Sequence, residues 1–271
     1  KTKRRIVPLL VLGLVSLVWV IPIVWMVDTA FKPSPEIFSS PPKFIPTHFT
    51  LDHFRELFAD WPFLRWVRNS FVLSASTALG SLVVASLAAY SFSRLKWRGR
   101  DALFLVFLGF MLLPWQVNVI PLFFTISKLG FIGTLPSVAF PIIGMPIGVF
   151  LLRQFFINIP RELEDAAFVE GCSTFGVLTR VILPVSKPAL AAFGIFIFNW
   201  AWKDFFWSMI SLRKPERLTL PVGLMFVHGS MDIDFGLFMA AARLATLPSL
   251  IVFILLRGYI FRGVTLASGF K

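Results

Sequence analysis

Residues 67–92 read VRNSFVLSASTALGSLVVASLAAYSF, a run in which Arg68 carries the only charge. A hydrocarbon core about 30 Å thick is crossed by a helix of about 20 apolar residues, so this run is long enough to span a membrane. The run is rich in Ser, Ala and Gly, and such small residues let helix backbones approach closely in lipid, where the hydrophobic effect does not drive association. We therefore predict a spanning helix at the centre of a helical bundle.

Five further apolar runs flank this one and are poor in charge. They cover residues 6–27, 102–126, 135–152, 189–212 and 235–261. Over the whole chain 57% of residues are apolar and 15% are charged, whereas an ordinary soluble domain has roughly 45–50% and about 25%. The sequence predicts an all-α polytopic membrane protein with about six transmembrane helices, forming a single domain over residues 1–271.

Proline residues divide several of these runs. We expect Pro114 and Pro121 to kink or interrupt the run 102–126, because proline removes a helical hydrogen bond and clashes with the preceding turn. The run 135–152 is expected to break at Pro141 and Pro146 in the same way. The last run surrounds Pro248.

The run 6–27 follows a basic cluster, as the apolar segment of a signal peptide does. It is about twice the length of that segment, and no small-residue cleavage site ends it. We therefore expect a retained first helix.

Basic residues predict the orientation, because loops rich in Lys and Arg stay in the cytoplasm. More than half of the 26 basic residues fall within four segments that alternate with the predicted outer loops. These segments are residues 1–5, 94–100, 153–187 and 257–271. Both termini are therefore predicted to lie on the cytoplasmic side of the inner membrane.

The net charge of +12 could indicate a nucleic-acid-binding protein, since basic patches are typical of surfaces that bind phosphate. Here the charges are dispersed among loop ends, where they anchor helices to anionic lipid headgroups, so we expect membrane lipid and no nucleic acid as a partner. Cys172 is the single cysteine and excludes an intrachain disulfide. His48, His53 and His228 do not have the spacing of metal ligands, so no metal site is predicted.

Two stretches between the runs lie on the predicted outer side. The stretch 28–66 is first Pro-rich and then amphipathic, with Leu51, Phe54 and Leu57 at helical spacing, which predicts a short interfacial helix. The stretch 213–234 carries Thr219, Pro221 and Gly223 and is interpreted as an outer loop available to an extracytoplasmic partner.

The loop of residues 159–184 reads IPRELEDAAFVEGCSTFGVLTRVILP and lies on the predicted cytoplasmic side. Glu162, Glu164 and Asp165 place negative charge in the first turn of a helix, where the helix dipole favours it. Gly171 suits the left-handed residue that ends a helix, and Ser173 suits the cap of the next one. Pro184 is expected to stop that second helix. The physical pattern alone fits either a rigid knob of two short helices or a simple amphipathic connector.

Three parts of this loop together resemble the EAA loop of permease subunits in binding-protein-dependent ABC importers. They are the residues Glu162-Leu163-Glu164-Asp165-Ala166-Ala167, the pair Glu170-Gly171 and the pair Leu183-Pro184 that ends 13 positions after the glycine. Asp165 stands where the family usually has Glu, Glu170 where it usually has Asp, and Cys172 where Ala is common. The first two departures keep the charge and the third keeps the size.

The resemblance covers nearly the whole chain and is closest to the sugar-importer branch that includes the maltose-type permeases. Ala30-Phe31-Lys32 is similar to the start of the family's first outer loop, residues 198–205 to the end of its fifth helix, and residues 263–271 to its C-terminal tail. The resemblance implies the type I (MetI-like) permease fold. It also implies transport of a carbohydrate or related polyol by alternating access.

The resemblance further implies three kinds of protein partner: a homologous second permease, a cytoplasmic ATPase dimer, and an extracytoplasmic solute-binding protein. The ATPases would grip a coupling element formed by Glu164, Asp165, Ala166, Ala167, Glu170, Gly171 and Pro184. ATP and Mg would bind those ATPase subunits, so this chain is expected to bind no cofactor and to be no enzyme. The sequence agrees, since it contains no Gly-x-x-x-x-Gly-Lys-Ser/Thr phosphate loop.

Four residues are candidates for the substrate pathway. Asn199, Trp200 and Trp202 carry the amide and aromatic groups that suit sugar rings, although Trp is also a common anchor at membrane interfaces. Arg243 is a charge inside the last run. Such a charge is costly in lipid and either contacts solute, snorkels to the interface or pairs with a partner such as Asp204.

Two other classes of protein form helical bundles in membranes. An ion-coupled secondary transporter or channel would be expected to carry acidic or His residues within its spans for ion coupling, whereas the charge that stands out within a span here is Arg243. A membrane-embedded enzyme would need catalytic polar groups clustered at one membrane face, and none stands out. Dependence of uptake on ATP and on a binding protein would distinguish the importer from both.

Overall fold

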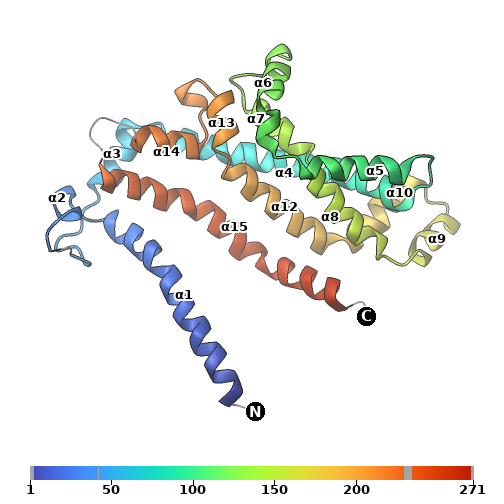
Figure 1. Ribbon diagram of the computed structural model, residues 1–271, viewed down its shortest axis with the longest axis horizontal. Coiled ribbons are helices and arrows are strands. Elements are labelled where there is room, and N and C mark those ends of the chain that lie inside the picture. The colour runs from blue at the N-terminus through green and yellow to red at the C-terminus, as the bar shows by residue number, and fades with distance from the viewer. Residues whose placement is uncertain (1–2, 42, 229–233, 270–271) are drawn as a thin grey trace. The chain divides into compact units, whose positions relative to one another are not determined.

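The structure is a computed structural model that describes residues 3–41, 43–228 and 234–269, and these form helices joined by turns without a strand (Figure 1). Outside the described residues lie parts of three segments used above: the basic cluster 1–5, the stretch 213–234 and the tail 263–271. The chain divides into two compact units, each described here by itself. Unit 1 comprises residues 1–67 and 220–248, and unit 2 comprises residues 68–219 and 249–271.

Three helices are long and apolar enough to cross a membrane, and three bent pairs of helices satisfy the same test together. The long helices are α1 (Lys3–Thr29), α4 (Phe63–Arg94) and α15 (Phe235–Gly269). The bent pairs are 100–112 with 115–128, 135–143 with 146–157, and 174–185 with 187–202. Counting each bent pair once gives up to six crossings, which confirms the predicted all-α class with about six spans.

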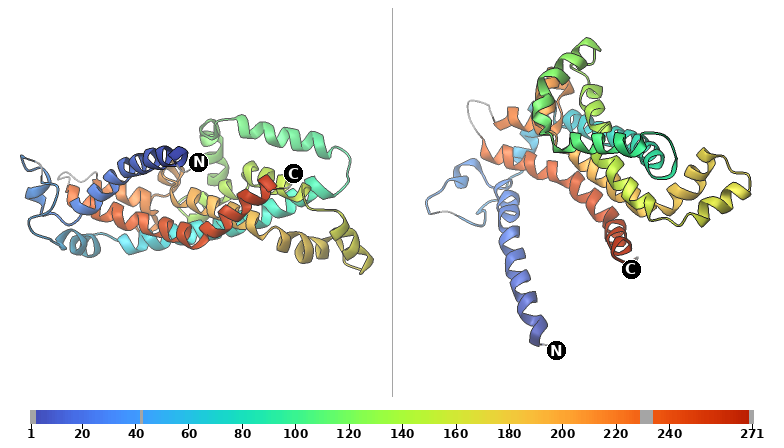
Figure 2. Two further views of the ribbon diagram at one scale, coloured as in Figure 1. Left: turned by 90° about the horizontal axis from the view of Figure 1, so that it is seen from below. Right: turned by 45° about the vertical axis from the view of Figure 1, so that its right-hand side comes forward.

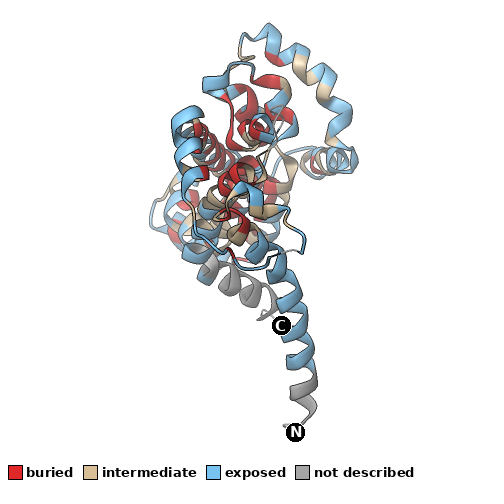
Figure 3. Cartoon of the chain, turned by 90° about the vertical axis from the view of Figure 1, so that its left-hand side faces the viewer, coloured by how far each residue is buried: buried red, intermediate tan, exposed pale blue. Residues whose placement is uncertain are grey.

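Helix α1 shows how these spans meet lipid. Its side chains from Pro8 to Trp25 are all exposed, and in Figure 3 the coloured part of this helix is pale blue for most of its length. An exposed, continuous apolar surface of this length is stable when lipid covers it.

Helix α4 has the opposite character within unit 2. Its small residues form a buried stripe in which no member is more than a tenth exposed: Ser70, Ser74, Thr77, Ala78, Ser81, Ala85 and Ala89. A Cβ added at Gly80 would lie 2.8 Å from the side chain of Ile143, so a neighbouring helix approaches this stripe closely. The predicted role of small residues in bringing helices together is therefore confirmed.

The breaks in the bent spans follow the prolines only in part. Leu113 and Met145 are extended and directly precede Pro114 and Pro146, because proline pushes the residue before it out of the helical region. The first break turns the chain by 95° and the second by 41°. The break predicted at Pro121 is wrong: this residue lies in the first turn of α6 (Val119–Lys128), where no helical partner for its missing N–H is needed.

The helices of the two central bent pairs are bounded as follows. The first contains α5 (Arg100–Gly109), η1 (Phe110–Leu112), η2 (Trp115–Asn118) and α6. The second contains α7 (Leu135–Ile143) and α8 (Pro146–Ile157), with Pro141 inside α7.

The fifth run is shorter than predicted. Helix α12 (Lys187–Trp202) ends ten residues before Leu212, and α13 (Phe206–Ser211) follows as a separate helix. The carboxylate of Asp204 accepts hydrogen bonds from the backbone N–H of Ser208 at 2.9 Å and from its hydroxyl at 2.7 Å. A side chain that satisfies the free N–H groups of a helix start favours a new helix there.

The stretch predicted as an outer loop instead contains a helix of unit 1, α14 (Leu220–His228), which follows the short turn η4 (Pro215–Arg217) of unit 2. Pro221 is tolerated because it falls in the first helical turn. Gly223 is required for packing, since a Cβ there would lie 2.3 Å from the ring of Trp66. Both residues are ordinary loop signals in sequence, and here each has a role in a helix.

The predicted amphipathic helix is confirmed as α3 (Asp52–Asp60). Its buried side is formed by Leu57 and His53. Nε2 of His53 lies 2.8 Å from the carbonyl oxygen of Lys32, and Nδ1 lies 3.5 Å from a carboxylate oxygen of Asp234. The Lys32 side chain is 1% exposed and forms an ion pair with Asp28, so buried polar groups hold this end of unit 1 together.

Candidate functional site

The loop after α8 folds as two short helices joined at a glycine. Helix α9 (Glu162–Val169) begins with the three predicted acidic residues in its first turn, and α10 (Thr174–Val177) follows it. Gly171 has a φ of 84°, which only glycine adopts without strain. The hydroxyl of Ser173 accepts the N–H of Gly176 at 3.2 Å and caps α10. The predicted glycine end and serine cap are confirmed, and we call residues 159–186 the knob.

In both views of Figure 2 the knob, coloured yellow to gold, lies at one end of unit 2 and extends past the adjoining ends of α8 and α12. Two elements connect α10 to α12: the π-helix η3 (Leu178–Ile182) and α11 (Leu183–Val185). The direction changes by 81° at Ser186 between the stretch 174–185 and α12. Pro184 was expected to stop the second helix, yet it lies within α11 and the bend follows two residues later.

A buried charge cluster attaches the knob to unit 2. Arg94, the last residue of α4, places its Nε 3.0 Å from an Oε1 of Glu164 in α9. Its Nη2 also donates to the carbonyl oxygens of Phe156 and Ile159, where α8 ends. The side chains of Arg94 and Glu164 are 4% and 9% exposed. One guanidinium therefore joins the ends of α4 and α8 to the start of α9.

Burial also determines the electrostatics of this cluster. Desolvation raises the pKa of the Glu164 carboxyl above its ordinary value, while the guanidinium groups of Arg94 and Arg161 act in the opposite direction. A buried ion pair of this kind costs desolvation energy, but removal of one partner leaves an uncompensated charge and costs more. Loss of either Arg94 or Glu164 is therefore expected to destabilise the attachment of the knob.

The predicted coupling residues divide into two sets. Glu164 and Ala167 are buried and face unit 2. Asp165, Ala166, Glu170, Gly171 and Pro184 are exposed. The exposed surface of α9 and α10 is also apolar, with Val169 at 89% exposure and Phe175 at 66%. The structure thus separates residues that anchor the knob from residues that present a surface.

A second arginine, Arg153 of α8, contacts α4 and α5. Nε of Arg153 donates to the carbonyl oxygen of Phe92 at 3.1 Å, and its guanidinium lies 4.0 Å from the centre of the Phe104 ring. Neither Arg94 nor Arg153 was identified from sequence as a site residue; both were counted only among the cytoplasmic basic residues. In the sequence each arginine follows the end of a predicted apolar run. Their partners could not be identified there, because these come from distant segments.

The four candidate pathway residues do not form one cluster in the structure. Trp202 is buried and stacked on Phe198, with ring centres 6.0 Å apart. The side-chain amide of Asn199 donates to the carbonyl oxygen of Ile195 at 3.1 Å. Trp200 is exposed and near Phe196. A role for these residues in the pathway stays a prediction.

Arg243 belongs to unit 1, where its guanidinium lies 4.4 Å from the centre of the Phe31 ring. Asp204, its suggested partner, belongs to unit 2 and accepts hydrogen bonds from Ser208 there. A cation over an aromatic face is stabilised without a carboxylate. This contact explains how a charge is accommodated in the last span.

Among the described residues no group of three or more His, Cys, Asp or Glu side chains has the arrangement of a metal site.

Comparison with known proteins identifies the family to which the chain is similar. Residues 81–266 match the family described as binding-protein-dependent transport system inner membrane component. The galactooligosaccharides transport system permease protein GanQ of Bacillus subtilis is 32% identical over 274 residues, covering 99% of this chain and 96% of GanQ. The trehalose/maltose transport system permease protein MalG of Thermococcus litoralis is 30% identical over 267 residues, covering 95% of this chain and 94% of MalG.

A solved structure shares the fold. A chain of a bacterial ABC transporter involved in import of the acidic polysaccharide alginate superposes with a TM-score of 0.86, at 21% identity, covering 94% of this chain and 95% of that one. This match confirms the fold expected for an importer permease. An ion-coupled carrier or channel is not favoured by any of these similarities. The chain is a multi-pass inner membrane protein and belongs to the family of inner membrane components of binding-protein-dependent transport systems.

Proposed function

We propose that this chain is the permease subunit of an ATP-driven importer that carries a carbohydrate or related polyol. The permeases GanQ and MalG, which are named for oligosaccharide and disaccharide transport, support this substrate class. Membership of the family of binding-protein-dependent transport components supports an extracytoplasmic binding protein as a partner. A homologous second permease and a pair of ATPases complete the proposed assembly, and ATP with Mg²⁺ binds to the ATPases.

The knob is the proposed contact for the ATPases. The observation that carries this proposal is the exposed apolar surface of a rigidly mounted helix pair, in which Val169 is 89% exposed. A large exposed apolar surface at the end of a membrane bundle is typical of an interaction site. Its mount is rigid because Arg94 and Glu164 join it to the ends of α4 and α8.

The proposed mechanism is alternating access. Closure of the ATPase dimer would pull on the knob, and the buried Arg94–Glu164 pair would pass that displacement to α4 and α8. A rigid-body movement of this kind switches a transporter between inward-open and outward-open packings. The basic segments and the knob lie on the cytoplasmic side in this proposal, together with both termini.

Substitution of Val169 tests the contact. Val169→Asp places a charge on the proposed apolar interface, where its desolvation costs more than about 1.4 kcal/mol. We therefore expect the ATPase to be lost on affinity purification. ATP-dependent sugar uptake should fall at least about tenfold. Leu129→Asp is the matched control, since Leu129 is 60% exposed at the end of α6, outside the knob.

The two variants must be recovered in equal yield from the membrane. Retention of the ATPase and full uptake by the Val169→Asp variant would contradict the proposed contact. A chain that transports in liposomes without ATP or a binding protein would contradict the importer itself.

A further inference from the structure

A cavity of about 480 Å³ opens at the turn between α4 and α5, and nothing in the proposed transport cycle uses it. Its lining comprises Lys96 and Trp97 of the turn, the residues 99–102 that begin α5, and Arg161 at the start of the knob. We call it the turn pocket. All of these residues belong to unit 2.

The turn pocket carries a surplus of positive charge. Its lining contains the cations Lys96, Arg100 and Arg161 against one carboxylate, Asp101. That carboxylate is already paired, since its oxygens lie 3.0 and 3.2 Å from Nε and Nη2 of Arg100. Within the described part of the chain, Lys96 and Arg161 have no carboxylate within 4.0 Å. Two cations therefore line the cavity without a direct ion pair.

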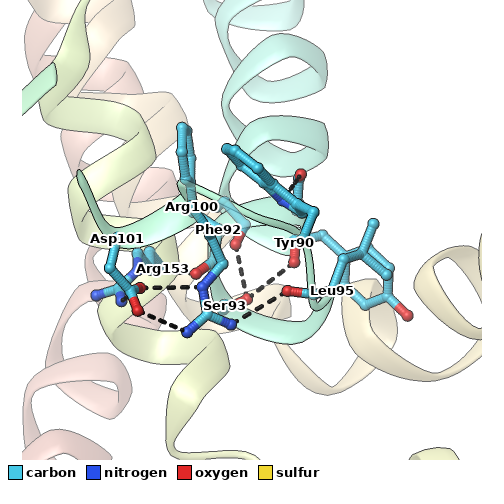
Figure 4. Close-up of polar contacts among 10 residues, drawn as sticks. Tyr90, Phe92, Ser93, Leu95, Arg100, Asp101 and Arg153 are labelled. Carbon is cyan, nitrogen blue, oxygen red and sulfur yellow. Dashed lines mark hydrogen bonds and ion pairs between the residues drawn. The ribbon is translucent and has the colours of Figure 1, made fainter. Parts of the chain in front are cut away.

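The walls of the pocket are held in place by hydrogen bonds. Figure 4 shows Arg100 between Asp101 and the backbone of Leu95, whose carbonyl oxygen accepts Nη1 at 3.1 Å. The indole N–H of Trp97 donates to the hydroxyl of Ser91 at 3.2 Å, and its ring lies against Phe92. An ordered cationic wall binds an anion with little loss of side-chain entropy.

The start of α5 adds to this field. Gly99 has a φ of 83° and provides no side-chain cap for the helix. The backbone N–H groups of the first turn therefore lack a helical acceptor on the side of the pocket. Such groups carry partial positive charge and favour an anion.

The position of the turn identifies the kind of anion. The turn 95–99 connects the end of one candidate span to the start of the next, and we therefore place it at the membrane surface, within reach of lipid headgroups. Basic pockets between spans bind anionic headgroups, and Trp is frequent at this depth. We propose that the turn pocket binds the phosphate of an anionic lipid headgroup such as phosphatidylglycerol.

This site would add a link between the α4–α5 turn and the start of the knob. Lys96 belongs to the α4–α5 turn, whereas Arg161 directly precedes α9 of the knob. A phosphate held by both would fix the start of α9 relative to the start of α5. Lipid binding itself does not depend on the transport function proposed above, so a failure of either proposal leaves the other standing.

Short-chain lipids test the site on the full chain in detergent. Dihexanoylphosphatidylglycerol, dihexanoylphosphatidylcholine and inorganic phosphate are titrated separately, and binding is followed by thermophoresis. We expect saturable binding of the anionic lipid only. The variant Lys96→Gln/Arg161→Gln should bind it about 25-fold more weakly, at about fivefold for each basic side chain near an anionic surface.

The matched control is Lys203→Gln/Lys214→Gln, which removes two exposed lysines of unit 2 outside the pocket. Unchanged affinity of this control supports the proposal, and an equal loss in both variants would overturn it as a general charge effect. Equal binding of the two lipids would overturn it as well, and binding of inorganic phosphate as tight as that of the anionic lipid would show a site for soluble phosphate instead. If the double variant is not recovered folded, Lys96→Gln alone provides the test, with a loss of about fivefold.

Discussion

Helices α9 and α3 are both short and both packed against their own unit, but they are amphipathic in opposite senses. In α3 the apolar Leu57 is fully buried, while Arg55 and Glu56 are exposed. In α9 the charged Glu164 is buried, while the apolar Val169 is 89% exposed. The first pattern is that of a helix stabilised by its own unit. The second indicates a helix whose exposed surface is completed by another molecule.

The two helices also differ in what anchors them. An ion pair with Arg94 holds α9, and this pair joins three helix ends. Contacts of His53 with the carbonyl of Lys32 and the carboxylate of Asp234 hold α3. We therefore expect substitution of Arg94 to reduce the coupling of ATP hydrolysis to transport. Substitution of His53 should reduce only the stability of the fold.

The largest effect is expected from Arg94→Gln. This change leaves Glu164 buried without its cation, which costs about 3 kcal/mol or more, and it frees the knob from α4. Sugar uptake per ATP hydrolysed should fall about tenfold, a typical size for a lost coupling contact. The measurement is uptake and ATP hydrolysis side by side in proteoliposomes.

His53→Asn is the comparison variant for that experiment. It should lower the melting temperature of the purified protein and leave uptake per ATP hydrolysed unchanged. An equal loss of coupling in both variants would show that the two anchors do not differ in function.

The next largest effect concerns close packing in unit 1. Gly223→Ala would place a Cβ 2.3 Å from the ring of Trp66, and overpacking of this kind costs about 1–3 kcal/mol. Thermal unfolding of the purified protein measures this loss. Gly109→Ala is the control, because a Cβ there meets no atom within 4 Å, and this variant should unfold as the unmodified chain does. Equal losses of thermal stability at the two positions would contradict the packing explanation for Gly223 in α14.

A smaller effect is expected at the bend of the knob. Gly171→Ala forces a φ of 84° on a residue with a Cβ, at a cost of about 1–2 kcal/mol, and alters the angle between α9 and α10. Gly176→Ala is the matched control five positions on, because its added Cβ would make only ordinary contacts. Uptake should fall several-fold for the first variant and little for the second, and the reverse order would contradict the geometry described for the bend.

The smallest effect is a pH dependence in unit 1. Hydrogen bonds from the hydroxyl and the backbone N–H of Thr47 lower the pKa of Glu36 below its ordinary value. A lowered pKa stabilises the fold above the unfolded pKa, and this contribution is lost as the pH falls through the lower, folded value. Glu36→Gln should therefore flatten the acid side of the plot of melting temperature against pH, whereas the exposed Glu56→Gln should leave it unchanged.

Local signals explain why much of this structure was predictable from sequence. The glycine at position 171 and the serine cap at 173 each act within a few residues, and each occurs where it was expected. The apolar runs form helices, although the fifth ends earlier than predicted. The loop reading of 213–234 failed because Pro221 and Gly223 have roles that depend on a helix start and on Trp66.

The partners of buried charges could not be predicted in the same way. Arg94 and Glu164 are 70 positions apart, and the sequence contains no local sign that they meet. For the same reason sequence placed Glu164 and Val169 in one loop without showing that the first is an anchor and the second is exposed.

Cross-linking from Val169 tests the central claim most directly. The variant Val169→Cys, made in a Cys172→Ser background so that this chain carries a single thiol, is treated in the assembled transporter with a reagent that has a maleimide at one end and a photoreactive group at the other. We expect a cross-link to the ATPase subunit and arrest of sugar uptake. A thiol that reacts freely in the assembled transporter, with no cross-link and undiminished uptake, would contradict the claim that the knob is the coupling element.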